Sequence, residues 1–247
     1  MSREVRLIAL AGIPELEEGD DLGALLVDAS QRAGGLEAGD VVVVAHKAVS
    51  KVEGRVVDLA EVHPSDRARE LAAGDDPRRV EVILRESREL LRARGSLLIT
   101  ETRHGFVCAS AGVDSSNAKG PGTVILLPLD PDGSAQRLRD DIREGVGIEV
   151  GVIVSDSFGR AWRQGTTDVA LGVAGVTPLL DLRGRRDSVG YELQATQIAV
   201  ADEIAGAAEL VMGKTEGVPA VIVRGVNASG DGRGVDLLMP PDRDLFR

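Results

Sequence analysis

Residues 40–45 read DVVVVA, and residues 151–155 read GVIVS. The first stretch is a continuous run of β-branched residues, which is typical of a strand buried on both faces of a sheet. The second is also apolar, and we expect its strand to end at Asp156, where polar residues begin. Both runs favour a chain built around β-sheet.

The rest of the chain alternates between helical and extended patterns, though unevenly. Helices are expected at residues 22–33, with Asp20 or Asp21 as the N-cap, and at 64–73, 77–94, 134–144 and 191–212. Further strands are expected at residues 5–11, 96–100, 106–110, 123–128, 169–176, 179–183 and 220–224. This order predicts an α/β or α+β fold, with mixed β-sheets and flanking helices. Because no long linker stands out, residues 1–247 are expected to form a single domain or two interleaved lobes.

The composition limits both the core and the partners. Aromatic residues make up 2% of the 247 residues, so aliphatic side chains must supply nearly all the burial. The net charge of -11 argues against a nucleic-acid or anionic-membrane surface, because phosphate backbones require clustered cations. A small phosphorylated substrate is still compatible with this charge, if arginines, lysines or metal ions at the site neutralise its phosphate. No stretch approaches the roughly 20 apolar residues that cross a bilayer, so we expect a soluble, cytoplasmic protein without a membrane partner.

Polar residues that follow predicted strands are the first candidates for chemistry. Residues 12–15 read GIPE, and their backbone amides could face a ligand, although an ordinary turn would have the same composition. Residues 46–51 read HKAVSK directly after DVVVVA. Two lysines and a hydroxyl group at the end of a strand can hold phosphates, or the lysines can simply be solvated.

Two further segments offer oxygen ligands for a metal ion. Residues 112–117 read GVDSSN, in which Asp114 could bind a cation and Asn117 a base or ribose, unless the segment is a capped turn. Residues 155–160 read SDSFGR, which places a carboxylate and a hydroxyl at the end of an apolar strand. Mg²⁺ and Mn²⁺ prefer such ligands, so Asp156 and Asp114 would suit one of these ions if the fold brings them together.

Other apparent motifs are misleading. Residues 212–217 read MGKTEG, but the P-loop pattern needs glycine where this chain has Ala208, and a strand before the motif rather than a helix. A Gly-rich phosphate or metal contact of another kind stays possible there. The three histidines have no metal-ligand spacing. Cys108 is the single cysteine, so it cannot form an intrachain disulfide, and we expect it to be a small buried residue.

Taken in series, these segments resemble one family, the coenzyme F420:L-glutamate ligases, also called F420-0:gamma-glutamyl ligases. The matching stretches are GIPE, HKAVSKVEGRVV, ETRHGFVCASAGVDSSNA, VIVSDSFGRAWRQGTTDVALGVAG and GKTEGVPAVIVRG, in the family's order over nearly the whole chain. The resemblance implies a homodimeric enzyme that uses GTP to ligate L-glutamate to the coenzyme F420 precursor, F420-0, and then adds gamma-linked glutamates. It implies Mg²⁺ or Mn²⁺ at two sites, often with K⁺. We expect an acyl-phosphate intermediate and the release of GDP and phosphate.

The resemblance also implies roles for single residues. Asp114 and Asp156 would hold the first metal ion, and Ser157 would help to hold the second. Nucleotide contacts would come from Gly12, Ile13, Pro14, Glu15, His46, Lys51, Asn117, Met212, Gly213, Lys214, Thr215, Glu216 and Gly217. His46 departs from the family pattern, because relatives usually carry serine there. We further expect Arg160 and Arg163 to hold a substrate phosphate or the glutamate carboxylate, since guanidinium binds such groups with two hydrogen bonds.

Two other functions stay open on the residues alone. A metal-dependent phosphohydrolase or kinase acting on a phosphorylated metabolite would use the same carboxylates, but it would need no amino acid. A non-enzymatic nucleotide-binding module would bind nucleotide through the same loops without turnover. Release of GDP that depends on glutamate separates the ligase from both.

Overall fold

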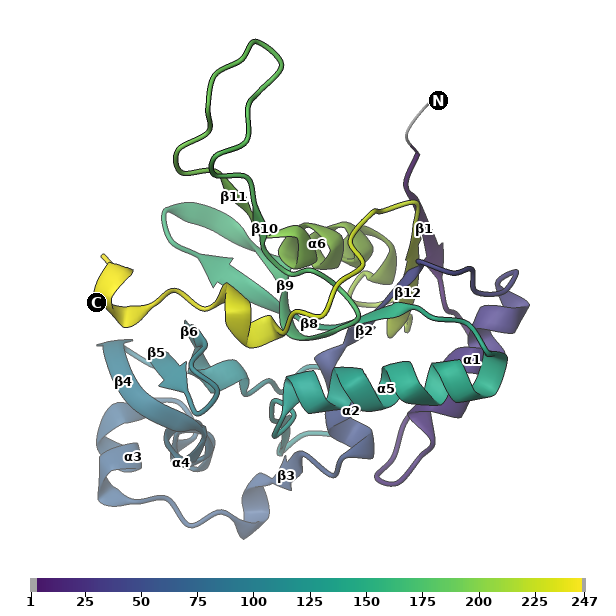
Figure 1. The fold of residues 1–247 in the computed structure, drawn as a ribbon. Helices are drawn as coiled ribbons and strands as arrows, with labels where there is room; N and C mark the ends of the chain where they lie inside the picture. The colour runs from purple at the N-terminus through teal and green to yellow at the C-terminus, as the bar shows by residue number, and fades with distance from the viewer. Residues whose placement is uncertain (1–3, 246–247) are drawn as a thin grey trace.

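A five-stranded sheet forms the centre of the molecule in the computed structural model, which describes residues 4–245 (Figure 1). Its strands, in spatial order, are β1 (Arg6–Ala9), β12 (Ala220–Arg224), β2 (Val41–Ala45), β8 (Gly151–Arg160) and β9 (Arg163–Ala174). Strands β2 and β8 are parallel, and the other neighbours are antiparallel. The sheet is therefore mixed, as the sequence predicted, and the DVVVVA and GVIVS runs are its adjacent inner strands.

Helices cover both faces of this main sheet, which confirms the predicted fold class. Val42 and Val44 pack with α1 (Leu22–Arg32) and α5 (Pro131–Val146) on one face. Val41 and Val43 point to the opposite face and pack with α6 (Val200–Met212). Successive side chains of a strand point to opposite faces, so an unbroken valine run is the pattern that a strand covered on both sides requires.

Helix α5 lies very close to strand β9 at Gly172. A Cβ atom built on Gly172 would lie 2.0 Å from the carbonyl oxygen of Pro131, in the first turn of α5. Any side chain at this position would push the helix away from the strand. Glycine here sets the distance between the sheet and its covering helix.

A smaller lobe is inserted into the chain after the short helix α2 (His46–Val52). Its elements are β3 (Val56–Asp58), α3 (Asp66–Leu71), α4 (Pro77–Glu86), β4 (Ser87–Arg94), β5 (Leu97–Thr102), β6 (Val107–Ala109) and β7 (Thr123–Ile125). Strands β3 and β7 pair with each other, so the chain enters and leaves the inserted lobe at one place. A separate cluster of buried residues, which includes Val80, Ile83 and Leu98, forms the lobe's core.

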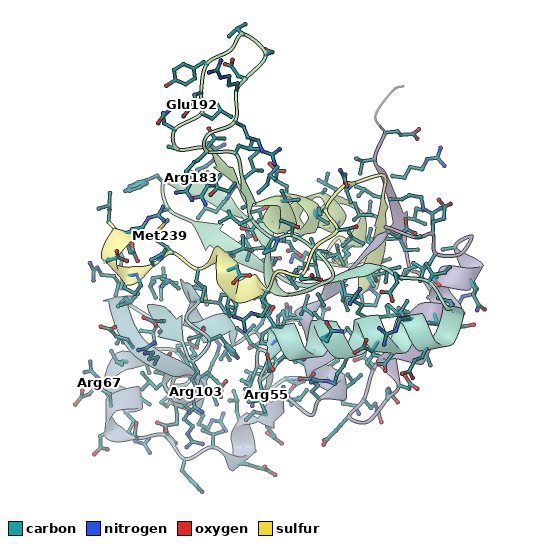
Figure 2. The ribbon with its side chains drawn as sticks, viewed as in Figure 1. Arg55, Arg67, Arg103, Arg183, Glu192 and Met239 are labelled. Atoms are coloured by element: carbon teal, nitrogen blue, oxygen red, sulfur yellow. The ribbon has the colours of Figure 1, made fainter. Side chains whose placement is uncertain are left out.

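A narrow arm extends away from the body of the molecule between β9 and α6 (Figure 1). At its base β10 (Leu180–Asp181) pairs with β11 (Gln197–Ile198), and residues 182–196 form the rest of the hairpin. Figure 2 shows Arg183 near the base of the arm and Glu192 farther out. Val189 and Tyr191 in the arm are 87% and 63% exposed.

Several boundaries predicted from the sequence were wrong. The strand expected at 169–176 already begins at Arg163. The helix expected at 77–94 ends at Glu86, where Ser87 turns to extended backbone, and residues 87–94 instead pair with β5. The helix expected at 191–212 begins only at Val200, because residues 191–198 belong to the arm. The strand expected to end at Asp156 continues to Arg160, because pairing with β9 extends it beyond the apolar core.

Most other predicted elements were confirmed. Helix α1 begins at Leu22, and its N-cap is Asp21, whose carboxylate accepts a hydrogen bond from the backbone N–H of Ala24 at 2.9 Å. Short 3-10 turns lie at Leu59–Glu61, Ser110–Gly112, Gly234–Leu237 and Pro241–Arg243. Over residues 4–245, no helix combines the length and the apolar character needed to cross a bilayer.

Candidate active site

A cavity of about 300 Å³ opens where the carboxyl ends of β2 and β8 meet the loops that follow β1 and α6. Ligand sites in open α/β sheets commonly lie at this edge. Residues from all five predicted segments line the cavity: Ile13, Pro14, Glu15, His46, Lys51, Asn117, Asp156, Ser157, Met212, Gly213, Lys214, Thr215 and Gly217. Segments far apart in the sequence therefore face one space.

Strand β8 divides its polar residues between two sides of the sheet. Asp156 points toward α2, where its Oδ1 lies 3.3 Å from His46 Nε2. Ser155 and Ser157, one residue to either side, point the other way and donate hydrogen bonds to the carboxylate of Asp168. The two-residue period of the strand thus creates two distinct polar clusters from the sequence SDS.

The first cluster centres on the buried His46, which is 1% exposed. Its Nδ1 lies 3.4 Å from the hydroxyl of Ser50, one helical turn later in α2. Its Nε2 is close enough to Asp156 for an ion pair, but the two groups are not aligned as a hydrogen bond, and Nε2 has no hydrogen-bond partner among the described residues. Cys108 also lies in this region, where burial, assisted by the charge of Asp156, raises the pKa of the thiol to about 12.

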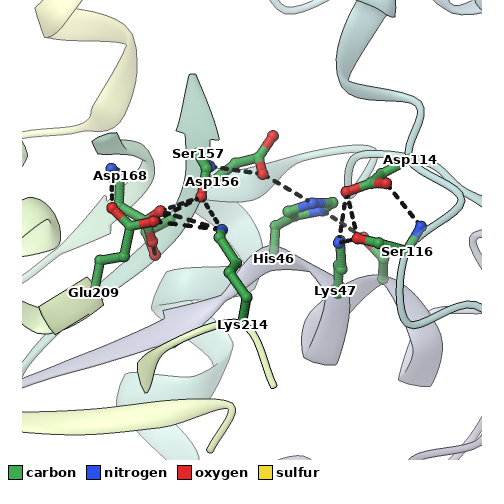
Figure 3. Close-up of polar contacts among 11 residues, drawn as sticks. His46, Lys47, Asp114, Ser116, Asp156, Ser157, Asp168, Glu209 and Lys214 are labelled. Carbon is green, nitrogen blue, oxygen red and sulfur yellow. Dashed lines mark hydrogen bonds and ion pairs between the residues drawn. The ribbon is translucent and has the colours of Figure 1, made fainter. Parts of the chain in front are cut away.

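The second cluster joins β8, β9 and α6 (Figure 3). Asp168 is 5% exposed, and its backbone N–H donates to Glu209 Oε2 at 3.0 Å. Lys214 contacts the hydroxyl of Ser157, and its Nζ lies 3.5 Å from Glu209 Oε1. Burial raises the pKa of Asp168 above its ordinary value, and the Glu209 charge adds to this, although hydrogen bonds from both serines oppose it.

Asp114 lies on the other side of the HKAVSK segment, at the edge of the inserted lobe. Its Oδ2 pairs with Lys47 Nζ at 2.6 Å, and Oδ1 accepts from the backbone N–H of Ser116 at 2.8 Å. Burial acts to raise the pKa of Asp114, but the hydrogen bonds from Lys47 and Ser116 outweigh it, so the pKa lies below its ordinary value. The carboxylate is therefore held in its charged form.

The two predicted metal ligands, Asp114 and Asp156, contact neighbouring residues of one segment. Figure 3 shows His46 and Lys47 between them, with Asp156 against the histidine and Asp114 against the lysine. Only Asp156 lines the cavity. Within residues 4–245, no three histidine, cysteine or acidic side chains are grouped closely enough to hold a metal ion unaided.

The loops around the cavity have defined conformations. Lys51 forms an ion pair with Glu15, which ties the GIPE segment to α2. Asn117 has a φ of +56°, a left-handed conformation that asparagine adopts more readily than most residues. Gly213 has a φ of +59°, and a Cβ there would lie 2.0 Å from the carboxylate of Glu216, which folds back over the GKTEG loop.

Five predicted site residues lie outside the cavity lining: Gly12, Asp114, Arg160, Arg163 and Glu216. Arg160 is exposed near the tip of the β8–β9 hairpin, where it donates a hydrogen bond to the backbone oxygen of Gln164. Within residues 4–245, this arginine forms no hydrogen bond or ion pair with a residue that lines the cavity. Its role in binding an anion stays a prediction.

A family model described as F420-0:Gamma-glutamyl ligase matches residues 12–225. The chain belongs to this family. The match includes the GIPE, HKAVSK, SDSFGR and GKTEG segments, and it confirms both the resemblance found in the sequence and the expected class of enzyme, a ligase that forms amide bonds.

Relatives of the F420-0:gamma-glutamyl ligase family match over nearly their full length. A protein of Methanothermobacter thermautotrophicus named coenzyme F420:L-glutamate ligase is 46% identical, with 98% of this chain and 99% of that protein covered. A protein of the same name from Methanopyrus kandleri is 48% identical, with 94% of this chain and 94% of that protein covered. Another, from Archaeoglobus fulgidus, is 43% identical, with 98% of this chain and 96% of that protein covered.

Sequence reasoning missed Asp168 and Glu209 as members of this family's candidate site. Asp168 lies in TTDVALG, which reads as the start of a buried strand, and Glu209 lies in an Ala-rich helix. They join the site only because β9 pairs with β8 in the register that sets Asp168 opposite Ser157, and because α6 packs on β9. The one available sign in the sequence was Asp168 itself, an acidic residue directly before an apolar run, where a functional carboxylate can lie.

Proposed function

We propose that this chain uses GTP to join L-glutamate to the carboxylate of F420-0 and then adds gamma-linked glutamates. The observation that carries the proposal is the convergence of the family's separate motifs on one cavity. The names of the three relatives, each a coenzyme F420:L-glutamate ligase, supply the substrates. The cytoplasmic location and the absence of nucleic-acid partners stay expectations from the sequence.

The cavity has suitable groups for a nucleoside triphosphate. Lys47, Lys51 and Lys214 supply positive charge within the lining, and the GKTEG loop supplies backbone amides next to a left-handed glycine. The lining otherwise contains several carboxylates, so the lysines alone do not balance a triphosphate. Bound divalent ions would supply the missing charge, which is the usual arrangement for phosphoryl transfer.

The donor atoms of the cavity fit Mg²⁺ or Mn²⁺. Asp156 and Ser157 offer the oxygen ligands that these ions prefer, and nucleotide oxygens usually complete their coordination. We propose that Asp156 and Asp114 hold the first ion and that Ser157 contributes to the second; K⁺ would be a further cation. When bound, the ions would polarise the phosphate oxygens and offset the charge that develops during transfer.

The residues of the chain would then act by positioning. Transfer of the γ-phosphoryl group to the F420-0 carboxylate would give an acyl phosphate and GDP. Attack by the glutamate amine on the acyl carbon would form the amide and release phosphate, while the amine loses a proton to solvent. Arg160 and Arg163 would move to bind an anionic substrate group, since both lie on the hairpin that continues β8.

A product-mass assay tests this proposal. Incubation with GTP, Mn²⁺, L-glutamate and F420-0 is expected to increase the product mass by one glutamyl unit and then by further units. GDP release that does not depend on glutamate would instead favour the phosphohydrolase or kinase. Nucleotide binding without any turnover would indicate a binding module.

We also propose that the chain forms a homodimer through its arm. Val189 and Tyr191 are large, exposed residues on a hairpin that the body of the molecule does not cover, and a projecting hairpin of this kind can pack against a second copy of the chain. The double variant Val189→Asp, Tyr191→Asp is expected to raise the dimer dissociation constant at least about tenfold, because buried tyrosines contribute strongly to interfaces.

Light scattering coupled to size-exclusion chromatography measures this effect. Leu210→Asp is the matched control, because Leu210 is 83% exposed on α6, outside the arm. A wild-type protein that is monomeric at micromolar concentration would refute the homodimer. An arm variant that dimerises as tightly as the wild type would place the interface elsewhere.

A further inference from the structure

His46 has one nitrogen whose surroundings the nucleotide-binding role does not explain. The ring is 1% exposed, and its Nε2 lacks a hydrogen-bond partner in the described part of the chain. A buried polar atom without a partner costs roughly 1–3 kcal/mol. The atom nevertheless faces a carboxylate oxygen, that of Asp156, at 3.3 Å.

The contact on the other side of the ring allows Nδ1 to carry the proton, because the hydroxyl of Ser50 can accept it. Nδ1 lies 3.4 Å from the hydroxyl of Ser50, which is also buried. If Nδ1–H donates to Ser50, then Nε2 presents a lone pair toward the negative Asp156. Two electron-rich atoms in a buried site repel each other unless a positive charge lies between or beside them.

The separation of the two atoms fits a shared metal ion. Two donors held about 2.1 Å from one octahedral ion, at a right angle, are about 3.0 Å apart. The distance of 3.3 Å between Nε2 and Oδ1 is close to this value. Histidine ligands usually donate their second ring N–H to a nearby oxygen, which fixes the ring, and Ser50 is placed to accept it.

We propose that His46 Nε2 is a direct ligand of the cation that Asp156 holds, with Ser50 as the residue that positions the ring. The inference rests on the proposed function, because it assumes that Asp156 binds a metal ion. It adds a nitrogen to a site otherwise made of oxygen ligands. Imidazole favours first-row transition metals over Mg²⁺, so this chain should discriminate in favour of Mn²⁺.

Pulsed electron paramagnetic resonance of bound Mn²⁺ tests the proposal directly. Protein with ¹⁵N-labelled histidine is prepared with Mn²⁺, in the presence and in the absence of GDP. We expect a histidine ¹⁵N coupling to Mn²⁺ that disappears in His46→Gln. The coupling should persist in His63→Gln, which alters an exposed histidine outside the cavity.

Metal titrations supply a second readout without turnover. His46→Gln is expected to reduce the preference for Mn²⁺ over Mg²⁺, taken as the ratio of dissociation constants, by about tenfold. Bound Mn²⁺ that shows no histidine coupling in the wild type would overturn the inference and leave the proposed function intact. Failure of Mn²⁺ to bind under either condition would overturn both, and the wild-type spectrum decides the matter even if the variant does not fold.

Discussion

Asp156→Asn is expected to lower kcat/KM for glutamate addition about a thousandfold or more, with the fold retained. A metal ion contributes several kcal/mol to charge stabilisation in phosphoryl transfer, and about 4 kcal/mol corresponds to a thousandfold change in rate. Asparagine keeps the shape of the side chain and an oxygen that can accept the hydrogen bond from the backbone N–H of Ser157. The loss should therefore come from the missing charge.

Product mass and GDP release, measured at saturating GTP over a range of Mn²⁺ concentrations, check this expectation. Asp140→Asn is the control, because Asp140 lies on α5 outside the cavity and pairs with Arg143 and Gln136 of the same helix. Near-normal activity of Asp156→Asn at low Mn²⁺ would show that this carboxylate is not a metal ligand. Unchanged thermal melting would confirm that the defect is chemical.

Gly172→Ala is expected to give the largest loss of stability among conservative changes in the sheet. The added methyl group would lie 2.0 Å from the carbonyl oxygen of Pro131 and 2.2 Å from its carbonyl carbon. Backbone atoms cannot rotate away as a flexible side chain can, so helix α5 must shift off β9. We expect the free energy of unfolding to fall by about 3 kcal/mol or more, which corresponds to roughly 10 °C in Tm.

Chemical denaturation of Gly159→Ala supplies the comparison. Gly159 lies in the adjacent strand β8, and a Cβ there meets no atom within 4 Å. Its free energy of unfolding is expected to change by less than about 1 kcal/mol. If Gly172→Ala were equally well tolerated, the close approach of α5 to the sheet could not be a determinant of the fold.

The inner strands of the main sheet could be predicted from sequence, because a strand buried on both faces is a continuous run of apolar, β-branched residues. Val41 to Val44 need no knowledge of the rest of the chain to be identified as a buried strand. Residues 87–94 are different, because SRELLRAR has a helical composition and becomes a strand only by pairing with β5. Such tertiary pairing overrides local preference.

The candidate site divides in the same way. Residues within recognisable motifs, such as Asp156 and Lys51, were predicted and line the cavity. Asp168 and Glu209 reach the site through strand register and helix packing, which single residues do not encode. His46 was predicted to lie in the site, but its orientation toward Asp156 depends on how α2 begins beside β8.

The pairing of β3 with β7, where the chain enters and leaves the inserted lobe, has a consequence for the order of folding. Strand β2 must find its parallel partner β8 across a long stretch of chain, since Val41 pairs with Gly151. Once β3 has paired with β7, the inserted lobe no longer adds to the flexible chain between β2 and β8. The loop that must close to pair β2 with β8 is then well under half as long. This shortcut lowers the entropy cost of closure by about 1 kcal/mol. We therefore expect the lobe to fold early. The pairing of β2 with β8, which creates the His46–Asp156 contact, should follow later.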